Sequence, residues 1–522
     1  WREGVRIDLH PRGWVLALDG SSLSTTEPFT SSFLRHKATV ARNLRSITVG
    51  YRDEHEFNRF RTDSTGALTF GSYRFYDWET FLQSPDTFRN KWRVAAGQRY
   101  DQALKNGSLS PSATATHYTA GFDLVRNPRR RLSTTFTYRR LVIEDSTLSA
   151  QKPEDSYLAR IDHDLNTFHG ALTLDLFYEF SSGLEPRKEF VYVQVPAGQG
   201  VYVWIDYNGD GLQSLDEFEV ANFAYEADYL RVQVPTTDYV RAFGNQFNAS
   251  VDLRAPTAWI GQKGMKGFVG KFSDFAVYRT DRKTGTDDLA LAVDPFRTNV
   301  EDSALTASNS SARNTIWFDR SSTAWSMDHT YQNDRGKNLL LNGYESRVRE
   351  SHKLHLRWNT TPKWTAQAEA MTGRNTSRSD LLGGRTWSIE EQGIEPSITF
   401  QPGTTFRAIL KFNVTQKKNS GELGGEAAEI QDLGTELRWN DPGKGSISGA
   451  FSLVRITYDG VVNSSLGNEM LGGLKPGDNL TWNIGVQRRL SDHLQIDLTY
   501  NGRKSEGTTA VHVGGAQVRA FF

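Results

Sequence analysis

The last twelve residues read Val511-His-Val-Gly-Gly-Ala-Gln-Val-Arg-Ala-Phe-Phe522, and they alternate in polarity up to a final aromatic side chain. Successive side chains of a β-strand point to opposite faces, so this alternation predicts a strand with one apolar and one polar face. The apolar face carries Ala516, Val518, Ala520 and Phe522, and the other carries Gly515, Gln517 and Arg519. The same alternation recurs along the whole chain, with Tyr, Trp or Phe at strand ends. This recurrence indicates a transmembrane β-barrel of the bacterial outer membrane.

The amino-acid composition fits such a barrel. Hydrophobic residues make up 37% of the chain and the mean hydropathy is −0.55. No segment approaches the run of about 20 apolar residues that a membrane helix requires, which excludes a helical membrane protein. In a barrel, lipid-facing side chains alternate with polar lumen-facing ones, so the averaged hydropathy is that of a soluble protein. The 45 glycines and the 12% aromatic content agree with this interpretation.

Cysteine content and charge exclude several classes of function. The chain has no cysteine, which removes disulfides, thiolate metal sites and cysteine nucleophiles. Lys and Arg number 61 and Asp and Glu number 61, so the net charge is zero and we expect no nucleic-acid partner. No signal peptide precedes Trp1, and strand-like alternation begins near Val5. We therefore expect a mature chain or a C-terminal portion of a longer protein.

The clearest hairpin is formed by two alternating segments joined by a short turn near 488–492. Its apolar positions are Leu480, Trp482, Ile484 and Val486 in the first segment and Leu494, Ile496, Leu498 and Tyr500 in the second. The same pattern recurs in 118–124, 172–180, 353–358 and 406–414. A one-sided soluble sheet alternates in the same way, so a single strand does not distinguish the two architectures.

The lengths of the connections favour the barrel. Tight links occur at 11–13, 127–130, 360–363, 401–403, 441–445 and 488–492. They alternate with long connections near 20–30, 54–66, 182–238, 281–311, 374–385, 417–430 and 459–478. Outer-membrane barrels have short periplasmic turns and long extracellular loops. We therefore predict an all-β fold, a single large antiparallel transmembrane β-barrel over residues 1–522, with about 22 to 24 strands.

The longest loop, 182–238, is expected to be an extracellular insertion, and it contains a calcium motif. The run Asp206-Tyr-Asn-Gly-Asp-Gly-Leu-Gln-Ser-Leu-Asp-Glu217 matches the twelve-residue EF-hand loop at its liganding positions. The predicted ligands are Asp206, Asn208 and Asp210, the carbonyl of Leu212, Ser214, and Glu217 as the bidentate carboxylate. Gly211 provides the sharp turn. Hard oxygen ligands at these spacings suit Ca²⁺.

The sequence around this motif lacks the usual helix pair. Val201-Tyr-Val-Trp-Ile205 has the composition of a strand, so we expect a strand-loop site in which Ca²⁺ makes an extracellular loop rigid. The alternative is a solvated turn rich in Asp, Asn and Gly.

The charged residues predicted for the polar face do not form a recognisable catalytic set. Asp162, His163 and Asp164 lie together near a strand end, but no serine elbow or second carboxylate pair accompanies them, so we predict no enzyme activity. The remaining lumen charges are expected to pair with one another or with water; they include Arg139, Arg357, Arg407, Arg438, Glu179 and Glu436.

One block of the insertion resembles a known group of proteins. It comprises Val195-Pro-Ala-Gly-Gln-Gly-Val-Tyr-Val-Trp-Ile-Asp-Tyr-Asn-Gly-Asp-Gly211, then Asp216-Glu-Phe-Glu-Val-Ala221 and Tyr229-Leu-Arg-Val-Gln-Val-Pro-Thr236. This block is similar to one in large, mostly uncharacterised outer-membrane proteins of Bacteroidota, which have a big C-terminal barrel. The resemblance implies the outer membrane and the barrel fold, and it implies no activity or catalytic residue.

Two classes of function remain. A barrel of this size has a lumen too wide for side chains alone to fill. The first hypothesis is a transport or secretion-type conduit; the second is an assembly scaffold with a plugged lumen that binds surface lipoproteins or other envelope proteins. A plugged TonB-dependent receptor would carry a globular plug domain before its first strand, whereas alternation here begins near Val5. Outer-membrane lipids are expected partners in either case.

Overall fold

The computed structural model describes residues 2–26, 30–62, 66–127, 129–149, 151–285, 288–297, 305–340, 343–380, 383–421 and 424–521. Phe522, the last residue of the predicted terminal strand, lies outside the described residues. Within the described ranges, no helix has both the length and the apolar character needed to cross a bilayer.

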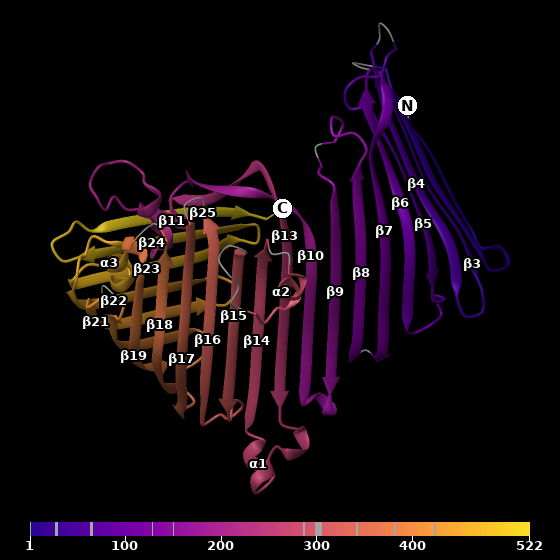
Figure 1. Cartoon of the computed structure of the whole chain (residues 1–522). Coiled ribbons are helices and arrows are strands. Elements are labelled where there is room, and N and C mark those ends of the chain that lie inside the picture. Colours follow the sequence, from indigo (N-terminus) through magenta and orange to yellow (C-terminus); the bar gives the residue numbers. More distant parts are fainter. Residues whose placement is uncertain are drawn as a thin grey trace. The chain divides into compact units, whose positions relative to one another are not determined.

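The described part of the chain is almost entirely β-structure. It forms one sheet of 25 strands, in which neighbouring strands such as β1 and β2, β16 and β17, and β24 and β25 pair antiparallel (Figure 1). Two of these strands, β11 and β12, have three residues each and belong to the insertion, which leaves 23 longer strands. The all-β class, the antiparallel order and the predicted number of strands are therefore confirmed.

The chain divides into two compact units. The first comprises Trp1–Glu185, Tyr239–Ser250 and Thr280–Ala304, and the second comprises Pro186–Asp238, Val251–Arg279 and Leu305–Phe522. The strands that lie wholly in the first unit are β1 (Arg2–Leu9), β2 (Trp14–Thr25), β3 (Thr30–Asn43), β4 (Thr48–Arg61), β5 (Tyr73–Gln83), β6 (Lys91–Lys105), β7 (Ser108–Asn127), β8 (Arg130–Ile143) and β9 (Glu154–Thr167). Three elements contribute residues to both units: β10 (Leu172–Gln194), β13 (Tyr229–Arg254) and β14 (Phe272–Thr284).

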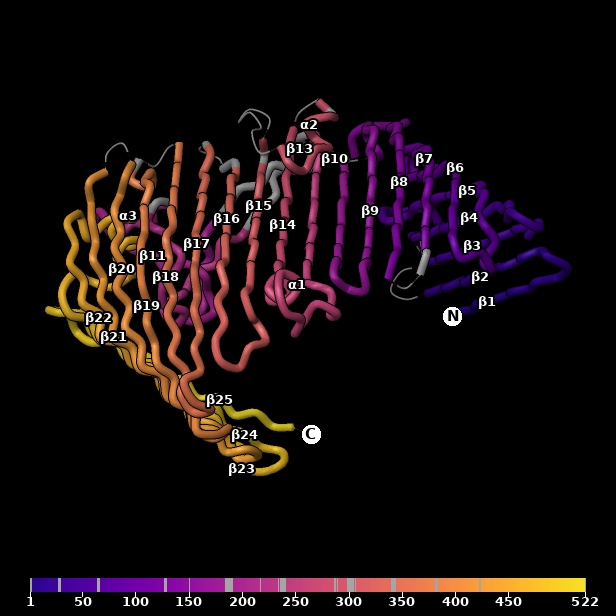
Figure 2. The backbone as a smooth tube through the Cα atoms, turned by 90° about the horizontal axis from the view of Figure 1, so that it is seen from below, coloured from indigo at the N-terminus to yellow at the C-terminus, as the bar shows by residue number. Residues whose placement is uncertain are grey.

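The second unit contains the remaining strands. They are β15 (Leu305–Phe318), β16 (Trp325–Leu340), β17 (Gly343–Thr361), β18 (Trp364–Ser379), β19 (Trp387–Phe400), β20 (Phe406–Asn419), β21 (Ala427–Asp441), β22 (Gly445–Asp459), β23 (Gly477–Ser491), β24 (Leu494–Ser505) and β25 (Val511–Ala520). Each pairs with its neighbour in sequence, and Figure 2 shows these strands following one another along a curved sheet. The helices are α1 (Met265–Val269) and α3 (Ser465–Leu471), with α2 (Leu289–Val293) in the first unit.

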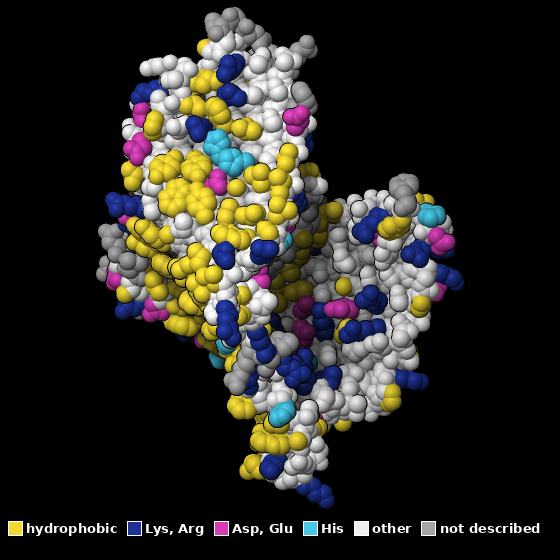
Figure 3. Space-filling view, turned by 90° about the vertical axis from the view of Figure 1, so that its right-hand side faces the viewer, with side chains coloured by type: hydrophobic (Ala, Val, Ile, Leu, Met, Phe, Trp, Pro, Cys, Tyr) yellow, Lys and Arg dark blue, Asp and Glu magenta, His cyan; other side chains and the backbone are white. Residues whose placement is uncertain are grey.

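One face of the sheet is apolar and exposed. In the second unit the register places Phe412, Leu433, Leu453 and Leu480 opposite one another on four adjacent strands. All four side chains are exposed, by 42 to 51%. In the first unit the exposed apolar positions include Val94, Phe122, Leu124, Phe136 and Val142. Figure 3 shows hydrophobic side chains gathered into broad patches on the surface that faces the viewer. A soluble sheet would bury such a face, so this surface is suited to lipid.

The opposite face carries charges. In the second unit Lys411 lies 3.0 Å from the Glu436 carboxylate. In the first unit Glu79 is paired with Arg52 at 3.2 Å and with Arg93. Because the side-chain period is two, one register places the exposed apolar row on one face and these ion pairs on the other.

Aromatic residues mark one end of the apolar face in the second unit. Trp325 lies opposite Trp358, and Phe406 lies opposite Trp439, each beside the connection that begins or ends its hairpin. The Trp364 ring lies 4.6 Å from that of its cross-strand partner Phe400. Rows of Trp and Phe at strand ends are typical of the membrane interface.

The connections differ from the prediction at several points. The long connection expected at 20–30 is short, since β2 ends at Thr25 and β3 begins at Thr30. Conversely, the connection 255–271 between β13 and β14 is long and contains α1, although it lies at the same end of the strands as the short turns. The strands also extend into the predicted loops, so the insertion proper is 195–228, between the end of β10 and the start of β13. Strands of 14 to 26 residues exceed the roughly 9–11 residues with which a barrel strand crosses a bilayer.

Candidate functional site

The predicted calcium loop lies in the insertion, and two short strands close its ends. β11 (Tyr202–Trp204) and β12 (Phe218–Val220) pair antiparallel, with Trp204 opposite Phe218. The predicted strand before the loop is confirmed. The last three residues of the loop form a 3-10 turn, and a second strand follows where an EF-hand has a helix.

In the first half of the loop, side-chain oxygen atoms accept hydrogen bonds from the loop's own backbone N–H groups. The Asp206 carboxylate accepts hydrogen bonds from the backbone N–H groups of Gly209 at 2.6 Å and Gly211 at 3.0 Å. Asn208 Oδ1 accepts from the Asp210 N–H at 2.9 Å. Gly209 and Gly211 have φ values of 76° and 72°, which favour glycine. The turn therefore holds the oxygen atoms of three predicted ligands on its inner side.

Three predicted carboxylate ligands converge. One oxygen from each of Asp206, Asp210 and Glu217 lies within 4.8 Å of the other two. Glu217 is only 2% exposed, and its Oε2 accepts hydrogen bonds from Trp204 Nε1 at 2.9 Å and from the Ser214 N–H at 3.3 Å. Its Oε1 is buried and has no hydrogen-bond partner among the described residues. A buried, unpartnered carboxylate oxygen beside two further carboxylates is the arrangement that a divalent cation stabilises.

The other three predicted ligands lie in the same loop. The Asn208 amide donates to Asp210 Oδ2 at 3.0 Å, so it lies beside the carboxylates. The Leu212 side chain is 68% exposed, as expected for a residue that would offer only its carbonyl. The Ser214 N–H contacts Glu217. The donor set is composed of hard oxygen atoms and fits Ca²⁺.

Within the second unit, the insertion is fixed to the connection between β18 and β19 by an arginine that the sequence pattern did not single out. Arg385 Nη2 donates to the Phe218 carbonyl at 2.6 Å and lies 3.2 Å from Glu219 Oε1. Both charged side chains are largely buried, at 12% and 10% exposure. Burial raises the pKa of Glu219, and the attraction of Arg385 opposes that rise. Removal of either partner would leave a buried charge behind.

A second arginine holds the other end of the insertion. Arg503 Nε and Nη2 donate to Glu226 Oε1 at 3.0 and 2.9 Å, and Arg503 Nη1 donates to the Gly473 carbonyl at 2.9 Å. Asn463 also donates to the Tyr207 carbonyl at 3.0 Å, which ties the calcium loop to the segment that contains α3. Figures 1 and 2 both draw β11 close to α3.

The α3 segment folds onto the charged face of the sheet. Met470 is fully buried against Trp387, Ile389 and Ala428. The register places these three residues on the same face as Glu436 and Lys411, opposite the exposed leucines. The insertion and α3 together therefore cover one end of the polar face of the second unit.

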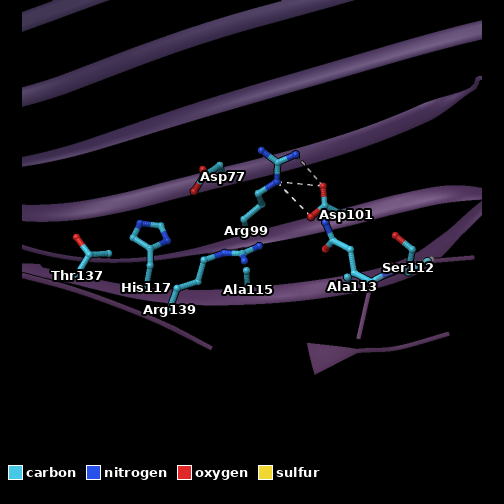
Figure 4. A pocket seen from close by; sticks show the side chains of 11 residues that line it. Asp77, Arg99, Asp101, Ser112, Ala113, Ala115, His117, Thr137 and Arg139 are labelled. Carbon is cyan, nitrogen blue, oxygen red and sulfur yellow. Dashed lines mark hydrogen bonds and ion pairs between the residues drawn. The ribbon is translucent and has the colours of Figure 1, made fainter. Parts of the chain in front are cut away.

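The first unit has a separate polar pocket. It has a volume of about 640 Å³ and lies over β5 to β8, beside the connection from β8 to β9 (Figure 4). Its lining includes Asp77, Arg99, Asp101, Ser112, His117, Thr137, Arg139, Ser149 and Gln151. Of the arginines predicted as lumen charges, Arg139 lies here. Glu436, expected to pair with another of these predicted lumen charges or with water, pairs instead with Lys411 in the second unit.

The Asp162-His163-Asp164 group does not form a catalytic arrangement. Asp162 is paired with Arg160 at 2.9 Å, and His163 Nδ1 lies 2.9 Å from the Arg131 carbonyl oxygen. Successive residues of β9 face opposite sides of the sheet, so the imidazole and the two carboxylates are separated.

No protein-family model and no curated protein sequence matches the chain. Solved structures similar to this one include the FrpB iron transporter from Neisseria meningitidis, at 9% identity and a TM-score of 0.36, covering 97% of this chain and 82% of that chain. The siderophore receptor PirA from Pseudomonas aeruginosa is 9% identical with a TM-score of 0.36, covering 98% and 80%. A variant of the ferric enterobactin receptor PfeA from the same organism is 10% identical with a TM-score of 0.33, covering 94% and 74%. Scores of this size identify neither a family nor a ligand for the chain.

Proposed function

We propose that the chain is an integral outer-membrane β-barrel protein that acts as a transport or secretion-type conduit. Its apolar face contacts lipid and its charged face lines the passage. The resemblance of the 195–236 block to outer-membrane proteins of Bacteroidota supports the same compartment. The protein is not proposed to be an enzyme.

The observation that carries this proposal is the separation of the two faces. Phe412, Leu433, Leu453 and Leu480 form an exposed apolar row across four strands, while Lys411 and Glu436 form an ion pair on the opposite face. Exposure of this row to water would be unfavourable, and its burial in hydrocarbon is favourable. The charged face must then remain in contact with water.

We further propose that Ca²⁺ binds to the 206–217 loop. The ligands are Asp206, Asn208, Asp210, the Leu212 carbonyl, Ser214 and Glu217, and the ion would neutralise three converging carboxylates. Its role is structural, since the loop connects β11 to β12 and β12 contacts Arg385. A rigid loop keeps the insertion on the polar face.

The conduit is tested by the conductance of the purified full chain in planar bilayers. We expect discrete current steps, and larger steps when residues 196–228 are replaced by a short Gly-Ser linker. Current only after this replacement would still support a conduit, one closed by the insertion. No current from either protein would overturn the proposal.

A second candidate function is a scaffold with a plugged lumen that binds lipoproteins or other envelope proteins. The observation that favours it is the cover that α3 and the insertion form over one end of the polar face. Loss of current in both proteins above, together with co-purification of a stoichiometric envelope protein from cross-linked outer membranes, would favour the scaffold.

A further inference from the structure

The polar pocket of the first unit contains two charged side chains, Asp77 and Arg139, that make no direct ion pair among the described residues. Arg99 is paired with Asp101 at 2.9 Å, and His117 lies 3.9 Å from Glu79. Asp77 and Arg139, in contrast, form no direct side-chain ion pair or hydrogen bond among the described residues, although His117 and Arg99 attract the Asp77 carboxylate from a longer distance. Figure 4 draws Asp77, His117 and Arg139 around the same space, on β5, β7 and β8.

Asp77 and Arg139 are both half-buried, so neither is fully solvated. A charge that is partly removed from water is stabilised when an opposite charge and hydrogen bonds are supplied. Besides the paired Arg99 and Asp101, the pocket offers the carboxylate of Asp77 and the guanidinium of Arg139 at once. A solute with a single charge would satisfy only one of them.

The other lining residues give the pocket its size and polarity. Ala113 and Ala115 are buried and small, and Ser112, Thr137 and Gln151 supply hydroxyl and amide groups. Gly97 lies opposite His117, and a Cβ there would be only 2.6 Å from the imidazole Nε2, so glycine allows the ring to pack against β6. A volume of about 640 Å³ accommodates a small solute with its hydrogen-bonding groups.

We infer that this pocket binds a small zwitterionic solute, an amino acid or short peptide, with its carboxylate on Arg139 and its ammonium group at Asp77. Arginine binds a carboxylate through two parallel hydrogen bonds, which fixes the orientation of the solute. The inference rests on the proposed function, because it places the pocket on the face that lines the passage.

The test is calorimetric titration of the full chain in lipid nanodiscs with three probes: glycylglycine, N-acetylglycine and glycinamide. The first carries both charges, the second only the carboxylate and the third only the ammonium group. We expect glycylglycine to bind at least tenfold more tightly than either analogue. Equal binding of glycylglycine and N-acetylglycine would show a simple anion site and overturn the inference. The absence of binding by all three probes would also overturn it.

Two variants separate recognition from misfolding. Asp77→Asn should weaken glycylglycine binding at least tenfold and make N-acetylglycine the preferred probe, whereas Arg139→Gln should make glycinamide the preferred probe. A misfolded protein would not show this exchange of preference. Arg131→Gln is the control, because Arg131 lies on the same face of β8 but pairs with Asp123 outside the pocket. If the preferences stay unchanged in both pocket variants, the assignment of the two charges is wrong.

Binding and conduction fail independently. Current in planar bilayers without binding of any probe would support the proposed conduit and overturn the inference about the pocket. Binding with the expected preferences, but no current even after replacement of the insertion, would support the inference about the pocket and overturn the proposed conduit.

Discussion

Replacement of Glu217 by glutamine is predicted to abolish the effect of calcium on the stability of the insertion. In the absence of calcium, the buried Oε1 of Glu217 has no partner and lies near Asp206 and Asp210. A glutamine at this position keeps an oxygen to accept from Trp204 and can present its amide to the neighbouring carboxylates. The variant should therefore be more stable than the wild type in chelator and should no longer respond to calcium.

The expected stability differences follow from the burial of the Glu217 carboxylate and from the mass action of calcium. An unsatisfied buried polar group costs about 1–3 kcal/mol, which is the expected gain of the variant in chelator. At a free calcium concentration of about 100 times the Kd, the wild type should gain about 2.7 kcal/mol that the variant lacks. The variant should therefore be the more stable protein in chelator. In calcium the wild type should become the more stable protein, or the two should be nearly equal in stability.

Hydrogen exchange of the peptide covering 201–220, in the full chain, measures this free energy locally. The wild type should exchange about 100-fold more slowly in calcium than in chelator, since about 1.4 kcal/mol corresponds to a factor of ten. Leu212→Ala is the matched control; its exposed side chain is not a ligand, so its calcium response should persist. The reasoning is refuted if Glu217→Gln retains the calcium-induced protection, or if it exchanges faster than the wild type in chelator.

Three further predictions concern docking, pH and the lipid-facing surface. Arg385→Ala should cost the docking of the insertion about 3 kcal/mol, because it leaves the buried Glu219 unpaired; rapid exchange at 218–220 would reveal this loss, and wild-type exchange would contradict it. Because burial raises the pKa of Glu219, its stabilising contribution is fully present below its unfolded pKa and is lost as pH rises through the folded pKa. In chelator, protection of 218–220 should thus fall as pH rises above the ordinary range of a carboxyl group, and Glu219→Gln should flatten this profile. Leu433→Arg should cost about 2–4 kcal/mol in urea unfolding from phospholipid vesicles. Thr481→Arg, on the polar face, should cost much less, and equal costs would mean that the apolar face does not contact lipid.

The alternation of polarity was sufficient to predict the secondary structure. Residues 480–486 and 494–500 lie in β23 and β24, and their apolar positions face one side as expected. The side-chain period of two comes from local backbone geometry, so it can be read from any short segment. The connections were predicted less well, because the end of a hairpin depends on how far the two strands continue to pair. Thus 20–30 is short, and 255–271 contains a helix on the opposite side.

The sequence by itself determined the two faces of each strand and the spacing of the calcium ligands, because both are set by residues close together in the chain. Tertiary structure alone decided that Glu217 is buried with one oxygen unpartnered, that Arg385 and Arg503 hold the insertion, and that Asp77 and Arg139 share a pocket. These contacts join residues on different strands, and more than 160 positions separate Arg385 from Phe218. Their formation depends on the register of a whole sheet, which no local pattern in the sequence encodes.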